Sequence, residues 1–224
     1  LRLIDLGLRR GDILVVQLPN VAEFAATYLA AMRLGVIVSP VPMQFRSHEL
    51  RQIVSVTHAR AVLTVPQFKG APFGAEAHEA ATQAGALPLH LGAQSASPAV
   101  GFYPVLDGDA ARLEARLRAE PVCSSDVATI CWTSGTEGVP KGVPRTHDHW
   151  LAHRHAHVLG ADIRPHDTLL NPFPLVNMAA IGGCFLSWLH VRGTLVLHHP
   201  VDLQVYLAQI ATEHFHQVLA EGAD

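Results

Sequence analysis

Short apolar runs alternate along the chain with segments whose apolar residues recur at helical spacing. The first run, residues 13–18 (ILVVQL), follows Gly11-Asp12 and ends before Pro19, which is typical of a buried strand. Further strands are predicted at residues 36–41, 61–65 and 87–91. Continuous apolar strands that are separated by helices indicate a parallel sheet with both faces covered. The pattern therefore predicts a doubly wound α/β fold.

The segments between these strands carry helix-end signals. Asn20 and Glu23 form a start that is similar to a capping box, and Gly35 stands where a helix would end in a left-handed residue. Ser47 is expected to cap a second helix, and an Ala-rich stretch at residues 76–84 predicts a third. Each of these helices joins two predicted strands, as parallel pairing requires.

The second half of the chain repeats the alternation after a break. Residues 92–101 are small and polar and predict a surface loop, and residues 110–119 predict a short amphipathic helix. The later elements are strands at 127–133, 168–171 and 194–197, and helices near 147–159, 178–191 and 202–212. We expect two subdomains, at residues 1–105 and 122–224.

Composition narrows the class of protein. Of 224 residues, 49% are hydrophobic and 16% are charged, so the chain can bury a sizeable core. A formal net charge of -3 gives no electrostatic reason to expect nucleic acid or an anionic membrane as a partner. Residues 168–191 lack Asp, Glu, Lys and Arg, but prolines and the Gly182-Gly183 pair argue against a transmembrane segment.

The three cysteines do not form a disulfide or metal-binding pattern. Cys123, Cys131 and Cys184 are too few for a disulfide scaffold and lack C-x-x-C spacing. We expect three buried thiols in a reducing cytoplasm.

The strongest chemical signal is the segment at residues 133–143, TSGTEGVPKGV. It brings three glycines, three hydroxyl side chains and a lysine together directly after a predicted buried strand. Glycines let backbone N–H groups surround an anion, hydroxyls add donors, and a lysine adds a compact positive charge. This combination predicts polyphosphate binding. The spacing is not that of a Walker loop, because Pro140 precedes Lys141 and Gly142 follows it.

The same segment resembles the phosphate-loop signature of the adenylate-forming superfamily, which includes acyl-CoA synthetases, aryl-acid ligases, luciferases and nonribosomal adenylation domains. The family pattern T/S-S-G-T-T-G-x-P-K-G-V is followed closely by T-H or S-H, which stands here as Thr146-His147. Inside the loop only Glu137 departs from the pattern, in place of the second Thr. Residues 11–20 and 32–42 also resemble family elements, so the resemblance spans essentially the whole chain.

The resemblance implies a two-step ligase reaction. A carboxylate attacks the α-phosphate of ATP, pyrophosphate leaves, and coenzyme A takes the acyl group from the acyl-adenylate. The implied cofactors are ATP, Mg²⁺ and coenzyme A. The residues that the resemblance assigns to the β- and γ-phosphates and Mg²⁺ are Thr133, Ser134, Gly135, Thr136, Glu137, Gly138 and Lys141. No residue of this chain is assigned a role as a catalytic group or as a direct metal ligand.

The expected partners are a carboxylic acid, ATP and coenzyme A. The protein partner considered is a second copy of the chain, in a homodimer. The expected location is the cytoplasm.

Residues 172–183, PFPLVNMAAIGG, resemble the P-L-F-H-x-x-G segment that lines the family's acyl pocket. Asn177 stands where His is usual, so it is a candidate substrate-binding residue that can hydrogen-bond a carboxylate without carrying charge. An Asn before a helix is also a good N-cap, and this alternative is equally open. Four downstream residues share one helical face and are expected in the core: Met178, Ile181, Phe185 and Trp188.

Five of the fifteen histidines lie within residues 147–157. His149, His153 and His157 are four apart, on one face of the predicted helix, but they extend along its axis and cannot all reach one ion. They also lack the glutamate of an H-E-x-x-H motif. We therefore expect a solvated polar face.

The usual chain of the family is substantially longer. Its Y-G-x-T-E segment, its ribose-binding aspartate and the lysine of its mobile C-terminal domain have no match here. Residues 1–224 are therefore expected to be an incomplete N-terminal AMP-binding domain of an acyl-CoA-synthetase-like fold, without the C-terminal domain.

Three functions remain open. The first is part of an acid–thiol ligase that activates a fatty or other apolar carboxylic acid. The second is an aryl-acid ligase of the hydroxybenzoate type. The third is a truncated, non-catalytic remnant with weak phosphate binding.

Overall fold

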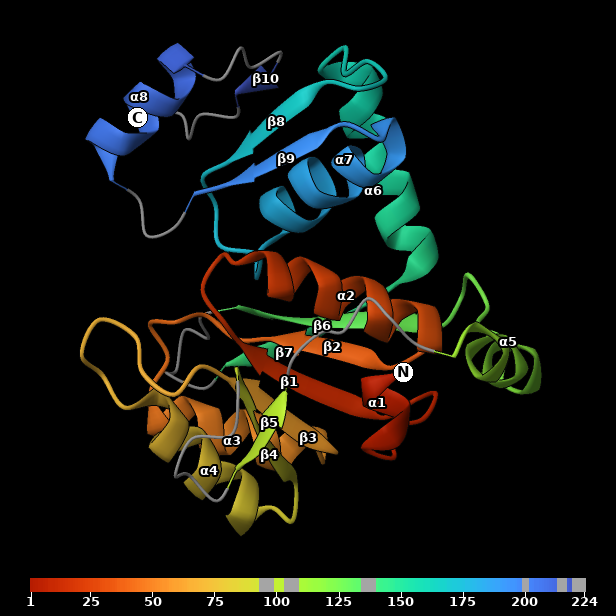
Figure 1. The fold of residues 1–224 in the computed structure, drawn as a ribbon, viewed down its shortest axis with the longest axis vertical. Coiled ribbons are helices and arrows are strands. Elements are labelled where there is room, and N and C mark those ends of the chain that lie inside the picture. The colour runs from red at the N-terminus through yellow and green to blue at the C-terminus, as the bar shows by residue number, and fades with distance from the viewer. Residues whose placement is uncertain (93–98, 103–108, 134–139, 199–201, 213–216, 219–224) are drawn as a thin grey trace. The chain divides into compact units, whose positions relative to one another are not determined.

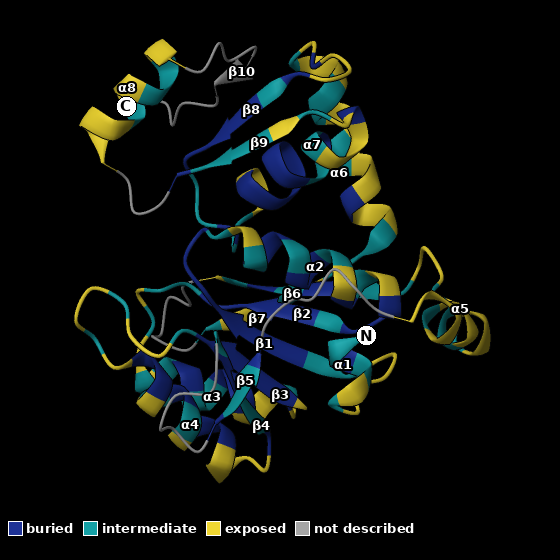
Figure 2. Ribbon diagram, viewed as in Figure 1, coloured by how far each residue is buried: buried dark blue, intermediate teal, exposed yellow. Residues whose placement is uncertain are grey.

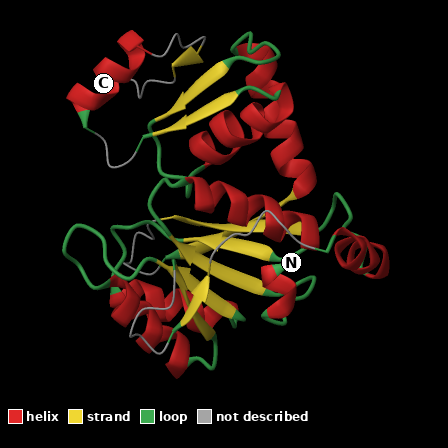
Figure 3. Cartoon of the chain, in the orientation of Figure 1, coloured by secondary structure: helices red, strands yellow, loops and turns green. Residues whose placement is uncertain are grey.

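The computed structural model describes residues 1–92, 99–102, 109–133, 140–198, 202–212 and 217–218. Helices and strands alternate along the chain (Figures 1 and 3) and form two compact units. Unit 1 consists of residues 1–18 and 23–146, and unit 2 of residues 19–22 and 147–224. The span between the predicted subdomains, residues 105–122, lies inside unit 1. The chain changes unit on both sides of the short segment 19–22 and again after Thr146.

Unit 1 is built on a seven-stranded sheet with the order β5-β4-β3-β1-β2-β6-β7. Its strands are β1 (Ile13–Gln17), β2 (Ile37–Pro40), β3 (Ala61–Thr64), β4 (Leu87–Leu91), β5 (Val100–Phe102), β6 (Val127–Thr133) and β7 (Lys141–Thr146). The first six pair in parallel, and β7 pairs antiparallel with β6. The predicted α/β fold with a mostly parallel sheet is confirmed.

Helices cover both faces of this sheet. The helices of unit 1 are α1 (Arg2–Asp5), α2 (Ala22–Leu34), α3 (Ser47–Thr57), α4 (Phe73–Gln83) and α5 (Ala110–Ala119), and α5 buries none of its residues. Figure 1 shows α2 on one face and α3 with α4 on the other. Gly35 follows α2 with φ +70°, which is the predicted left-handed helix end.

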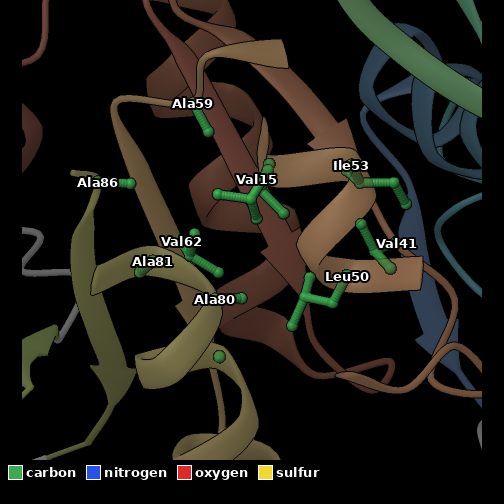
Figure 4. Packing of buried hydrophobic residues seen from close by; sticks show 11 residues of the cluster. Val15, Val41, Leu50, Ile53, Ala59, Val62, Ala80, Ala81 and Ala86 are labelled. Atoms are coloured by element: carbon green, nitrogen blue, oxygen red, sulfur yellow. The ribbon is translucent and has the colours of Figure 1, made fainter. Parts of the chain in front are cut away.

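The core of unit 1 explains why apolar and polar residues do not alternate along its central strands. Val15 of β1 and Val62 of β3 pack against Leu50 of α3 and Ala80 of α4, and all four are at most 1% exposed (Figure 4). The neighbouring residue Val16 points to the opposite face because side chains alternate along a strand, and it is fully buried as well. Figure 2 shows the central strands as buried along nearly their whole length.

Unit 2 contains a smaller sheet of the order β10-β8-β9, with all strands parallel. Its strands are β8 (Thr168–Asn171), β9 (Thr194–Leu197) and β10 (Gln217–Val218). Its helices are α6 (His147–Gly160), the π-helix η1 (Ala179–Phe185), α7 (Leu186–Val191) and α8 (Leu203–Thr212). A buried cluster of Ile163, Leu169 and Val191 forms the core beside β8.

The helix predicted at residues 178–191 is divided into η1 and α7. Ile181 and Phe185 are fully buried as expected, whereas Met178 is 37% exposed and the prediction that it lies in the core is wrong. A π-helix has more residues per turn than an α-helix. Residues chosen at α-helical spacing therefore do not stay on one face of the helix where it becomes a π-helix. Gly182 lies against the imidazole of His153, and a Cβ at this position would collide with the ring.

Three further expectations are wrong. Asn20 does not cap α2, because its side chain hydrogen-bonds the main chain of residues 173, 175 and 198. Residues 100 and 101, predicted to be loop, belong to the edge strand β5, which pairs with β4. Cys123 is exposed rather than buried, whereas Cys131 and Cys184 are buried.

No helix in the described ranges combines the length and the apolar character that a membrane span requires.

Gly193 supplies a test of the packing in unit 2. An alanine methyl group here would overlap the main-chain oxygen of Asp167, which accepts a hydrogen bond from Thr194 N–H at the start of β9. We expect Gly193→Ala to lower the free energy of unfolding by about 2 kcal/mol or more, measured by urea denaturation. Gly160→Ala is the control, because nothing lies within 4 Å of its Cβ position. Equal stability of the two variants would contradict the described turn.

Candidate functional site

The predicted phosphate loop connects the two strands of a β-hairpin in unit 1. Thr133, at the end of β6, is the register partner of Lys141, at the start of β7. The Thr133 hydroxyl donates a hydrogen bond of 3.5 Å to the main-chain oxygen of Lys141. The other candidate phosphate ligands, which are Ser134, Gly135, Thr136, Glu137 and Gly138, lie outside the described residues.

Strand β7 is the element that sequence reasoning missed at this site. The pattern predicts a glycine-rich loop that leads to the helix at 147–159, but six residues of strand lie between them. Gly142 and Pro144 are poor strand formers, and Pro144 is tolerated because β7 is the edge of the sheet. The loop thus leads into a strand, and a helix N-terminus does not follow it directly.

The two described ends of the loop are suited to an anion. Thr133 and Lys141 are both exposed. None of the ion pairs among the described residues involves Lys141. Its ammonium group is therefore not neutralised by a carboxylate from the described part of the chain, and it fits the role of a phosphate ligand.

Packing fixes the strand that leads into the loop. The indole Nε1 of Trp132 donates a hydrogen bond of 2.8 Å to Ser39 Oγ on β2. Side chains of Ile130 and Trp132 lie 2.9 and 3.1 Å from the position of a Cβ on Gly142, so a larger residue there would have to displace one of them. A pocket of about 540 Å³ lies beside these residues; it is lined by Gln52, Ile53, Ser55, Val56, His58, Trp132 and Pro140.

The second candidate segment follows the carboxyl end of β8 in unit 2. Asn177 is half-buried, and its Oδ1 accepts a hydrogen bond of 2.8 Å from Ala180 N–H in the first turn of η1. This contact is that of an N-cap. The cap occupies the amide oxygen, and the Nδ2 group is the part of the side chain that a substrate role would use.

Buried asparagines hold this segment. Asn171, which is fully buried at the end of β8, accepts a hydrogen bond from Phe173 N–H at 3.1 Å. Asn20 hydrogen-bonds the main chain of Phe173 and Leu175. Sequence reasoning did not find Asn20, although its place after the carboxyl end of a parallel strand, where ligands bind in open α/β sheets, is a signal that points to it.

The histidines of α6 divide between solvent and the protein interior. His149 and His155 are exposed, whereas His153 and His157 are half-buried. His157 Nδ1 lies 3.4 Å from the hydroxyl oxygen of Ser187, and burial, with a smaller effect of His153, lowers its pKa. The expectation of a wholly solvated face is therefore wrong for two of these residues, because α6 packs against η1 and α7.

Within the described ranges, no three His, Cys, Asp or Glu side chains are placed to hold a metal ion. Burial raises the pKa of the Cys184 thiol to about 12, so it stays protonated and unreactive at neutral pH.

Comparison with known proteins identifies the family. Residues 1–219 match the AMP-binding enzyme family, and the chain belongs to this family. It is 34% identical over 170 residues to a salicylyl-CoA synthase / salicylate adenylyltransferase from Streptomyces sp, an alignment that covers 72% of this chain and 30% of that protein. It is 28% identical over 201 residues to the long-chain-fatty-acid–CoA ligase FadD13 of Mycobacterium tuberculosis, which covers 87% of this chain and 36% of that protein.

The fold agrees with a solved structure of the same class. ATP-bound MatB from Rhodopseudomonas palustris superposes with a TM-score of 0.72 at 23% identity, over 94% of this chain and 40% of that chain. At this identity the likeness is one of fold. The chain spans about a third of the length of the curated relatives described above.

The N-cap role of Asn177 can be measured directly. Asn177→Ala removes the acceptor for Ala180 N–H, and we expect it to lower the free energy of unfolding by about 1 kcal/mol. Asn177→Asp keeps an oxygen acceptor and should stay close to the wild-type stability in the same urea titration. If the alanine variant unfolds at the wild-type midpoint with an unchanged slope, the cap does not contribute to stability.

Proposed function

We propose that this chain is part of an ATP-dependent acid–thiol ligase that activates a carboxylic acid as its acyl-adenylate and transfers the acyl group to coenzyme A. The observation that carries the proposal is the phosphate-loop signature between β6 and β7, with an exposed Lys141, in a chain of the AMP-binding enzyme family. Relatives that act as coenzyme A ligases support the same reaction class.

In the first step, a carboxylate oxygen forms a bond to the α-phosphorus, and the bond from that phosphorus to the pyrophosphate oxygen breaks. Negative charge grows on the leaving pyrophosphate, and donors placed around it lower the barrier. The proposed donors are the hydroxyls of Ser134 and Thr136, the backbone N–H groups of the glycines, and Lys141. The Thr133 hydroxyl joins them by exchanging its 3.5 Å bond to the Lys141 main-chain oxygen for one to a phosphate oxygen. Glu137 is part of the same proposed loop. The same loop would hold Mg²⁺ together with the phosphates, and the ion would supply additional charge neutralisation.

In the second step, the thiol sulfur of coenzyme A attacks the acyl carbon and AMP leaves. The proposed acid site includes Asn177, whose Nδ2 group can donate a hydrogen bond to the carboxylate or to a hydroxyl of the acid. Because ATP and coenzyme A are intracellular metabolites, the proposal includes a cytoplasmic location. The exposed free thiol of Cys123 agrees with a reducing compartment.

The identities favour an aromatic acid over a fatty acid as substrate. The salicylate-activating relative is 34% identical over 170 residues, and the long-chain fatty acid ligase is 28% identical over 201 residues. A neutral asparagine at position 177 also suits a hydroxylated aromatic acid, because its Nδ2 group can donate a hydrogen bond to a hydroxyl oxygen. A fatty or other apolar acid is the second candidate, supported by the larger share of the chain that aligns.

Lysine replacement tests the phosphate site. The chain has two lysines, Lys69 and Lys141, and both are exposed. In the complete gene product that carries this chain, Lys141→Ala should lower ATP–pyrophosphate exchange by about 10²–10³-fold, because one charged donor to the leaving group is lost. Lys69→Ala is the matched control and should keep the wild-type exchange rate. An unchanged rate in Lys141→Ala would remove Lys141 from the site.

A substrate panel tests the acid class. We expect salicylate and 2,3-dihydroxybenzoate to support faster pyrophosphate exchange than octanoate, at equal concentrations and saturating MgATP. Faster exchange with octanoate would favour the fatty-acid alternative. Absence of exchange with every acid, while ATP still binds in equilibrium dialysis, would support the non-catalytic remnant instead.

A further inference from the structure

Asn20 forms three hydrogen bonds with a part of the chain that is more than 150 residues away. Its Nδ2 group donates to the main-chain oxygens of Phe173 at 2.8 Å and His198 at 3.4 Å. Its Oδ1 accepts from Leu175 N–H at 2.9 Å. The residue is 8% exposed, so these bonds replace water at a buried carboxamide.

The partners of Asn20 lie just beyond the carboxyl ends of two parallel strands. Phe173 and Leu175 follow β8, and His198 follows β9 directly. His198 N–H donates to the main-chain oxygen of Asn171, so the two strand ends are also bonded to each other. In open parallel sheets, ligands bind outside the carboxyl ends of the strands. Asn20 therefore holds the backbone at the edge of this sheet where a ligand is expected.

Only a carboxamide of this length satisfies all three bonds. An aspartate would keep the acceptor for Leu175 N–H but would place an oxygen against the carbonyl groups of Phe173 and His198. A leucine would remove donor and acceptor and leave three main-chain groups without their partner, which costs more than the bond itself contributes. The environment thus selects a side chain that donates and accepts at once.

We propose that Asn20 is a positioning residue for the carboxylic acid: it holds the Phe173–Leu175 main chain and so sets where Asn177, two residues further on, presents its Nδ2 group to the substrate. This inference rests on the proposed function, since it assumes that the segment after β8 binds the acid. Asn20 belongs to unit 2, whereas Thr133 and Lys141, the described ends of the phosphate loop, belong to unit 1. Its loss should therefore affect the acid and leave ATP binding unchanged.

Gln17 offers a matched control from the same stretch of sequence. It is 1% exposed, and its Nε2 donates to the main-chain oxygens of Pro42 at 3.0 Å and Phe45 at 2.8 Å. Like Asn20, Gln17 is a buried carboxamide that hydrogen-bonds the main chain of a loop. The loop that Gln17 holds follows β2 in unit 1. Replacing either residue by an apolar one removes hydrogen bonds from a buried carboxamide, and of the two only Asn20 is bonded to the segment after β8.

The experiment compares Asn20→Leu, Asn20→Asp and Gln17→Met in the complete gene product that carries this chain. ATP–pyrophosphate exchange is measured without coenzyme A, with salicylate and octanoate as probes. For Asn20→Leu we expect the KM for the acid to rise by about 10–100-fold, because a small displacement of a substrate-positioning group has effects of this size. The KM for ATP should stay within about twofold of the wild type, and Gln17→Met should change neither.

The outcomes separate the inference from the proposed function. Suppose that the wild-type enzyme is active. If the KM for the acid is then unchanged in both Asn20 variants, or rises equally in Gln17→Met, only the positioning role is overturned. A wild-type protein without exchange on either acid overturns the proposed function, and the positioning role with it. If Asn20→Leu does not fold, Asn20→Asp decides: a raised acid KM at constant ATP KM supports the role, and parallel changes in both KM values contradict it.

Discussion

Parallel strand pairing is the constraint on which the rest of this structure depends. A parallel strand can be joined to its neighbour only by a crossover, so β1, β2 and β3 require α2 and α3 between them. Helices on both faces bury both faces of the strands, which is why Val15 and Val16 are equally inaccessible. The carboxyl ends of the strands then meet at one edge of each sheet. In unit 2 these ends carry the segment with Asn177.

The main-chain groups of loops at such an edge cannot form the hydrogen bonds that pair neighbouring strands. Buried carboxamide side chains form hydrogen bonds with them instead. Gln17 bonds the loop after β2, and Asn20 bonds the segments after β8 and β9. These two residues are three positions apart in the chain, yet they serve different units. The same chemistry therefore stabilises two sheet edges, and the short segment 19–22 belongs with residues that are far away in sequence.

The parts of the fold that were predicted correctly are those with a strong local period. The strand at 13–18 and the helix that ends at Gly35 lie in the structure within one or two residues of their predicted bounds. Strand β7 was missed because Gly142 and Pro144 are poor strand formers, and the strand is defined by its pairing with β6. The π-helix was missed because its longer period depends on the contacts of a buried segment rather than on its composition. At the candidate site, Thr133 and Lys141 were predicted from residue type, spacing and the family resemblance, and Asn20 was assigned to a helix cap.

The amino-acid sequence by itself determined the alternation of strands and helices, the glycine- and hydroxyl-rich composition of the predicted phosphate loop and the family to which the chain belongs. Each of these rests on residues within a few positions of one another, where periodicity and side-chain chemistry act locally. Only the tertiary structure decided that the loop joins two antiparallel strands, that His153 and His157 turn away from solvent, and that Asn20 bonds residues 173, 175 and 198. These features depend on hydrogen bonds and burial between distant segments, which local propensity does not encode.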